Sequence, residues 1–273
     1  MKKNNAILLS TPYIIWMVVF TLIPLGVVGY YALTDPATGV FSLGNLKDLG
    51  MYMPVLWQSI WYSLISAFIC LLLGYPVAYY IAHRGVVAQK ILYMLVMLPM
   101  CMSFLLRTLA WVGLLQDTGI INDILEAIGI GRIQMIRTPG AVILGMVYNY
   151  LPYMILPLYS TIVKINPRLI EAAEDLGCNS VQVFSRVVLP LSVPGILSGI
   201  TMVFVPAVST FYISQKLGGT ETVLIGDVIE RLFKQGQNQN LGAALSLVLM
   251  VLVFVCTGIM NRFGGDEEGG VVV

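Results

Sequence analysis

Long stretches without a charged side chain dominate this sequence and restrict what it can fold into. The chain has no Asp, Glu, Lys or Arg in residues 4–34, 49–83, 138–163, 187–215 and 235–261. A helix needs about 20 mostly apolar residues to cross the hydrocarbon core of a bilayer. Each of these stretches is long enough, so the sequence predicts a polytopic, all-α membrane protein.

The composition excludes a soluble protein. Hydrophobic residues make up 58% of the chain and charged residues only 11%, whereas soluble domains have about 25% charged residues. A soluble protein of this size could not bury so much apolar surface. The net charge of +1 gives no field that would attract nucleic acid. The four cysteines are far apart and His83 has no acidic or cysteine neighbour at ligand spacing, so no metal site is expected.

The positions of the charges predict six membrane spans. Arg107 lies inside the third span, roughly 24 Å along the helix axis beyond Lys90, and we expect its side chain to snorkel to the far interface. In the fifth span, Gly195 and Gly199 form a GxxxG pattern typical of close helix packing. The spans are expected near 7–33, 57–82, 91–115, 140–163, 190–213 and 242–261.

The loops suggest an orientation and a boundary. With both termini in the cytoplasm, the inner segments carry eight Lys and Arg residues against six outside, a bias in the direction of the positive-inside rule. Helical patches at 120–128 and 223–233 are expected on the outer surface. We expect one membrane domain over residues 1–263, followed by a disordered, acidic and glycine-rich tail at 264–273.

The cytoplasmic loop 164–190 breaks the apolar pattern with two short helices. Asn166 can cap the first helix, Pro167 suits its first position and Gly177 can end it. Asn179 or Ser180 can cap the second helix, which reaches residue 188. The spacing of the apolar residues i, i+3, i+4 and i+7 predicts one face that another protein can approach closely, formed by Leu169, Ala172, Ala173 and Leu176.

The same loop contains three acidic residues whose role the residues alone leave open. Glu171, Glu174 and Asp175 are typical of solvated surface charge. A carboxylate site for a metal ion or for acid–base chemistry is an alternative, although no histidine accompanies them. A contact with another protein is the third interpretation.

The spacing of this loop resembles the EAA loop of ABC importer permeases. That family pattern reads E-A-A-x3-G-x9-I-x-L-P, and the chain departs from it only at Val187, where isoleucine is usual. The resemblance implies a type I importer permease (MetI-like) fold and a coupling helix that seats in a groove of a cytoplasmic ATPase. The residues it implies for this coupling are Glu171, Ala172, Ala173, Gly177, Leu189 and Pro190.

Further segments are similar to the B subunits of spermidine/putrescine permeases, over roughly residues 10 to 263. They include Leu73-Gly74-Tyr75-Pro76, Leu106-Arg107-Thr108, Leu156-Pro157-Leu158-Tyr159-Ser160 and Leu217-Gly218-Gly219. This resemblance implies ATP-driven polyamine import in a bacterial inner membrane. The partners it implies are membrane lipid, a second homologous permease subunit, a homodimeric cytoplasmic ATPase and an extracytoplasmic polyamine-binding protein. Alternatives are the same machine with another small solute, or an ATP-independent secondary transporter.

The chain has no motif for catalysis of its own. A GxxxxGK[ST] phosphate loop is missing from the sequence, as are GxSxG and HExxH. We therefore expect no catalytic residue and no cofactor in this chain, and assign ATP and Mg to the partner ATPase.

Aromatic and polar residues of the fourth and fifth spans are candidates for the substrate path. Tyrosine faces attract ammonium groups by cation–π interactions, each worth about 0.5–2 kcal/mol. Weak, repeated contacts of this kind suit translocation, because a tight site would retain the substrate. The alternative is that these residues pack between helices or form interfacial aromatic belts. The candidates are Tyr148, Asn149, Tyr153, Phe211 and Tyr212.

Overall fold

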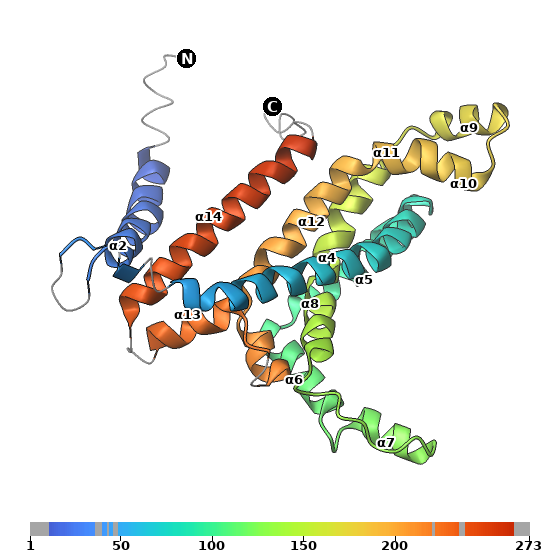
Figure 1. Cartoon of the computed structure of the whole chain (residues 1–273). Helices are drawn as coiled ribbons and strands as arrows, with labels where there is room; N and C mark the ends of the chain where they lie inside the picture. Colours follow the sequence, from blue (N-terminus) through green and yellow to red (C-terminus); the bar gives the residue numbers. More distant parts are fainter. Residues whose placement is uncertain are drawn as a thin grey trace, which may run out of the picture. The chain divides into compact units, whose positions relative to one another are not determined.

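The computed structural model describes residues 11–35, 40–42, 44–45, 49–219, 222–234 and 238–264. These residues form helices, with an isolated β-bridge between Thr34 and Phe41, and the predicted all-α class is confirmed (Figure 1). The elements (η marks 3-10 or π-helical turns) are η1 Val18–Leu22, α2 Ile23–Ala32, η2 Leu49–Tyr52, α4 Met53–Ala82, α5 Val86–Met97, η3 Leu98–Cys101, α6 Phe104–Leu115, α7 Ile120–Ala127, α8 Pro139–Ile162, α9 Pro167–Asp175, α10 Ser180–Val183, η4 Phe184–Val188, α11 Leu189–Leu191, α12 Val193–Val208, η5 Ser214–Gly218, α13 Ile225–Lys234 and α14 Gln239–Gly264.

Within the described residues, five helical segments are long and apolar enough to cross a bilayer, and a bent pair raises the number to six. The predicted number of six is the upper of these values. The pair joins Ser180–Leu191 to Val193–Val208 at an angle of 63°. The five unbroken segments are Thr11–Ala32, Leu49–Ala82, Phe104–Ala127, Pro139–Ile162 and Gln239–Met260.

The third predicted span is interrupted. The sequence predicts one continuous helix over 91–115, but the structure has α5 and η3 up to Cys101 and a new helix, α6, from Phe104. Pro99 lacks the amide hydrogen that an α-helix needs at this point, and the turn around it tightens to a 3-10 helix. Ser103, with ψ of 130°, then starts α6 as its N-cap residue. The break divides the apolar stretch into two helices.

The described residues fall into two compact units. The first is drawn from Met1–Pro54 and Val228–Leu252, and the second from Val55–Asp227 and Val253–Val273. In the first unit, the buried residues Ala32, Ala243 and Ala244 pack together, and the Asn240 side-chain amide donates to the Thr34 carbonyl oxygen at 2.6 Å. The predicted disordered tail at 264–273 lies outside the described residues except for Gly264, the last residue of α14.

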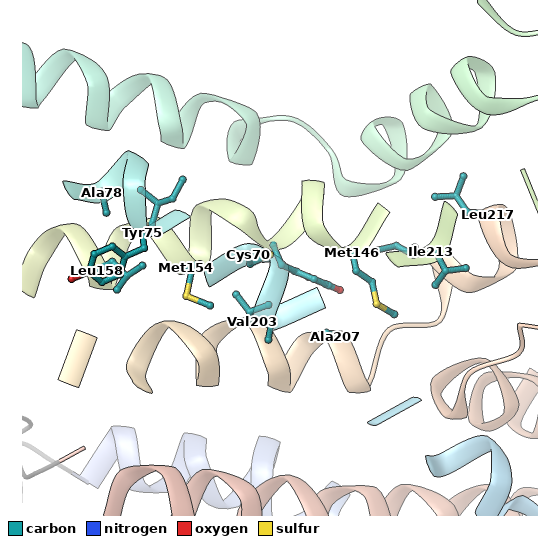
Figure 2. Close-up of a cluster of buried hydrophobic side chains, with 14 of the residues drawn as sticks. Cys70, Tyr75, Ala78, Met146, Met154, Leu158, Val203, Ala207, Ile213 and Leu217 are labelled. Carbon is teal, nitrogen blue, oxygen red and sulfur yellow. The ribbon is translucent and has the colours of Figure 1, made fainter. Parts of the chain in front are cut away.

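The core of the second unit lies between α4, α8 and α12. Figure 2 shows Met146 and Met154 of α8 extending toward Ala207 and Val203 of α12, all four fully buried. Cys70 of α4 is equally buried in this cluster. The second unit therefore has a packed core, and the loop 164–190 and the aromatic residues of α8 extend from it.

The GxxxG face predicted in the fifth span is confirmed as a close contact between α12 and α8. A Cβ atom added at Gly195 would lie 2.6 Å from Thr161 Oγ1 and 3.0 Å from the Pro157 carbonyl oxygen. One added at Gly199 would lie 2.6 Å from Met154 Sδ. A side chain at Gly195 would force the helices apart, and one at Gly199 would displace the Met154 side chain, so the two glycines allow α8 and α12 to pack closely.

Candidate functional site

The helix α9 begins and ends as the loop sequence predicts. The Asn166 side-chain oxygen accepts a hydrogen bond from the Arg168 backbone N–H at 3.1 Å, and Pro167 is the first helical residue. At the other end Gly177 adopts φ of +85°, and its N–H donates to the Glu174 carbonyl oxygen at 2.8 Å. A left-handed residue at this position is a common helix end, and glycine adopts it without steric cost.

The four residues predicted to share one face of α9 are separated by the structure. Ala173 is 9% exposed and packs with the buried Val183 and Val188, whereas Leu169 and Leu176 are 50% and 86% exposed. Ala173 lies inward because α10 and η4 fold back against α9, a tertiary contact that helical spacing does not reveal. The outward surface of α9 thus joins apolar to acidic side chains, namely Leu169, Glu171, Ala172, Glu174, Asp175 and Leu176.

The second short helix is stabilised by a reciprocal cap. Of the two predicted capping residues, Asn179 is the cap: its side-chain oxygen accepts from the Gln182 N–H at 2.9 Å. The Gln182 side chain accepts from the Asn179 N–H at 3.0 Å, which completes a capping box. We call the two helices, Pro167–Val183, the α9–α10 hairpin (Figure 1). Leu189 and Pro190 follow it in α11, at the exposed surface.

Aromatic residues of α4 contact η4, the turn that directly follows the hairpin. The Phe184 ring contacts the Tyr75 and Tyr79 rings edge-on, with centroids 5.5 Å and 5.9 Å apart. The Tyr75 hydroxyl group also lies 2.8 Å from that of Ser192, at the bend between α11 and α12. A movement of the hairpin would therefore reach both α4 and α12.

The candidate path residues lie in the second unit around α6, α8 and η5, and their surroundings differ. Tyr148 contacts Trp111 and Tyr212 contacts Phe104, with centroids 5.3 Å and 6.3 Å apart. We call these residues, with Tyr153 and Phe211, the aromatic surface. Tyr148, Tyr153 and Phe211 are exposed, and Trp111 and Tyr212 are partly exposed.

Asn149 does not belong to this surface. It is 1% exposed, and its side-chain amide donates to the Gly145 carbonyl oxygen at 2.9 Å. Gly145 lies against Leu217 and Ile213, so this face of α8 is covered by η5 and cannot meet a passing solute. The helical stripe that grouped Asn149 with Tyr153 in the sequence is therefore split by packing.

The structure adds Arg107 to the candidate functional residues. The sequence predicts that the Arg107 side chain snorkels to the far interface, but the structure buries it at 7% exposure. Its Nε and Nη1 atoms have no hydrogen-bond partner, and no carboxylate of the described residues forms an ion pair with it. An ionisable residue inside a membrane span is a candidate functional residue, so the position of Arg107 within an apolar stretch is the signal in the sequence that could have identified it.

The acidic residues of α9 do not form a metal site in the structure. No group of three or more His, Cys, Asp or Glu side chains within the described ranges is placed to hold a metal ion. Glu171, Glu174 and Asp175 are exposed on the outward surface of α9.

Comparison with known proteins places this geometry in a family. Residues 72–264 match the family described as binding-protein-dependent transport system inner membrane component. The spermidine/putrescine transport system permease protein PotB of Haemophilus influenzae is 40% identical over 256 residues, which cover 90% of each chain. A solved bacterial ABC transporter for the import of alginate has a chain that matches with a TM-score of 0.76 at 21% identity, covering 97% of both chains. A chain of the MetNI methionine ABC transporter matches with a TM-score of 0.61 at 16% identity, covering 80% of this chain and 96% of that one.

Proposed function

Because the chain belongs to the family of binding-protein-dependent transport system inner membrane components, we propose that it carries polyamines and that its α9–α10 hairpin couples it to an ATPase. The chain is a permease subunit of an ABC importer, a multi-pass inner membrane protein without catalytic activity of its own. Its partners include an ATPase and a binding protein. The predicted fold class, that of type I ABC importer permeases, is confirmed.

Spermidine and putrescine are the substrates we propose. The observation that carries this proposal is similarity over nine-tenths of the chain to PotB permeases. The aromatic surface is consistent with it, because tyrosine and tryptophan faces attract ammonium groups. Lys216 illustrates this chemistry within the chain: its Nζ atom lies 5.7 Å from the centroid of the Tyr212 ring. Tyr148, Tyr153, Phe211 and Tyr212 remain the proposed path residues. Asn149 does not, because it is buried.

The α9–α10 hairpin is the proposed ATPase contact. Its exposed Leu169, Ala172 and Leu176 can enter an apolar groove, while Glu171 remains free to pair with a basic residue at the rim. Ala173 and Gly177 shape the hairpin, since one fills its core and the other ends its first helix. Leu189 and Pro190 lead from the hairpin into the bend before α12.

The proposed mechanism is alternating access. ATP binding closes a homodimeric cytoplasmic ATPase, which draws the coupling hairpins of this subunit and of a second homologous permease together. The contacts of Phe184 with Tyr75 and Tyr79, and the hydrogen bond of Tyr75 with Ser192, pass that motion to α4 and α12. We propose that the path then opens to an extracytoplasmic polyamine-binding protein. In this arrangement both termini are cytoplasmic and residues 1–263 act as one membrane domain.

Uptake of labelled spermidine and putrescine tests the substrate. We expect cells lacking this chain to regain ATP-dependent uptake when it is restored, and each polyamine to compete with the other. If restoring the chain left polyamine uptake unchanged, the chain would still be a permease, but its substrate would be another small solute. Uptake that continues without ATP would favour the alternative of a secondary transporter.

A charge reversal tests the coupling. Glu171→Lys is expected to abolish uptake and weaken ATPase binding, because the proposed basic residue at the rim of the ATPase groove would repel the new lysine. Asp117→Lys, an equal charge change at an exposed position after α6, is the matched control and should leave both intact. If Glu171→Lys left ATPase binding and uptake intact, the coupling proposal would be wrong.

A further inference from the structure

Arg107 occupies an unfavourable position that helix stability does not explain. It lies in the first turn of α6, where its backbone N–H donates to the carbonyl oxygen of the N-cap residue Ser103 at 3.1 Å. The N-terminus of a helix carries a partial positive charge, so a cation in this turn is disfavoured. Burial removes the side chain from water as well, and a buried charge is costly without a counter-charge. Nothing in the described residues supplies that counter-charge.

The position of Arg107 brings it next to the aromatic surface. Phe104, Arg107 and Trp111 follow one another at intervals of three and four residues, so they lie on one side of α6. Phe104 meets Tyr212 and Trp111 meets Tyr148, which places Arg107 between two aromatic pairs along the helix.

An unpaired charge in such a site acts over distance. Arginine stays protonated in proteins, and a charge away from water is only weakly screened. A paired guanidinium would have its field cancelled by the neighbouring carboxylate. The field of Arg107 instead extends over the surface on which ammonium groups are attracted by the rings, and arginine residues serve as barriers to cations in other membrane pores.

We propose that Arg107 is a fixed positive charge that weakens polyamine binding on the aromatic surface, and weakens it more for spermidine, with three ammonium groups, than for putrescine, with two. The role is that of a specificity-determining residue, and it rests on the proposed polyamine function. By opposing the attraction of the rings, Arg107 keeps a polycation from remaining bound in the path. This opposition is strongest for spermidine, the substrate whose three ammonium groups are attracted most by the rings.

Equilibrium binding of labelled polyamines to the purified membrane complex, with its ATPase and without the binding protein, tests this role. We expect Arg107→Met to lower the Kd of putrescine by on the order of threefold and that of spermidine by roughly tenfold, because the repulsion grows with the number of charges. Arg107→Lys keeps the charge and is expected to bind like the unchanged complex. Arg132→Met removes an exposed arginine that pairs with Asp123 and Glu126 and is the control.

Three results would overturn the role of Arg107. They are equal Kd values for Arg107→Met and the unchanged complex, a change of the same factor for both polyamines, and an Arg107→Lys variant that behaves like Arg107→Met. The unchanged complex gives a separate test that needs no variant to assemble: the third ammonium group of spermidine should add little affinity over putrescine. A large gain from it would also overturn the proposal. Uptake experiments distinguish failure of the Arg107 proposal from failure of the proposed function. A complex that transports no polyamine contradicts the proposed function itself.

Discussion

The hydroxyl group of Tyr75 lies 2.8 Å from the hydroxyl group of Ser192, and this hydrogen bond joins α4 to the bend that precedes α12. Ser192 also donates to the Leu189 carbonyl oxygen at 2.9 Å, and its backbone is where the helix changes direction by 63°. The same tyrosine ring contacts Phe184. One residue of α4 therefore touches both the turn that carries the hairpin and the bend that connects it to the spans.

Tyr75→Phe is expected to uncouple ATP hydrolysis from transport. The variant keeps the ring contact with Phe184 but loses the hydrogen bond to Ser192. The net contribution of such a bond to stability is about 1 kcal/mol. We expect more ATP to be hydrolysed for each polyamine transported, measured in reconstituted vesicles. Tyr80→Phe removes a hydroxyl from an exposed ring of the same helix, which contacts Arg84, and should leave the ratio unchanged. An unaltered ratio in Tyr75→Phe would show that the bond does not carry the motion.

Gly177 gives a prediction that depends on the backbone alone. A Cβ atom added there meets nothing within 4 Å, but φ is +85°, and this conformation costs other residues about 1–2 kcal/mol. Gly177→Ala should therefore loosen the hairpin and lower the amount of ATPase that copurifies with the permease. Gly177→Asn should lose less, because asparagine tolerates the left-handed region. Equal losses for the two variants would point to side-chain contact with the partner instead.

Two neighbouring alanines separate folding of the hairpin from docking. Ala173 is buried against Val183 and Val188, whereas Ala172 is exposed. Ala173→Leu overfills the hairpin, at a cost of about 1–3 kcal/mol, and should raise its rate of amide hydrogen exchange. Ala172→Leu should leave exchange unchanged. We expect both to reduce ATPase binding, so a normal affinity in Ala172→Leu would remove Ala172 from the proposed contact.

Much of the architecture follows from local properties of the sequence. Charge-free stretches locate the spans because a charged side chain is costly in the bilayer, and the ends of α9 follow from Asn166, Pro167 and Gly177. These signals act within a few residues and need no knowledge of the rest of the fold. The GxxxG contact of Gly195 and Gly199 with α8 belongs to the same class.

The remainder depends on contacts between residues far apart in the chain. Helical spacing groups Ala173 with Leu169, and Asn149 with Tyr153, but α10 and η5 cover one member of each pair. Proline inside a membrane helix often produces only a kink, so Pro99 does not by itself predict the new start at Ser103. The burial of Arg107 likewise differs from the snorkelling side chain that the local sequence predicts.

Gly195 gives the sharpest test of the α8–α12 packing. The added methyl group of Gly195→Ala would come within 2.6 Å of Thr161 Oγ1 and 2.8 Å of Thr161 Cβ. Thr161 is held close by the backbone of α8, so the two helices must separate, and overpacking of this kind costs about 1–3 kcal/mol. We expect a lower thermal unfolding midpoint for the purified protein in detergent. Gly113→Ala in α6, where a Cβ atom meets nothing within 4 Å, should unfold at the original temperature. If the two variants unfolded alike, α12 could move away from α8 without loss, and the close packing of these helices would not depend on Gly195.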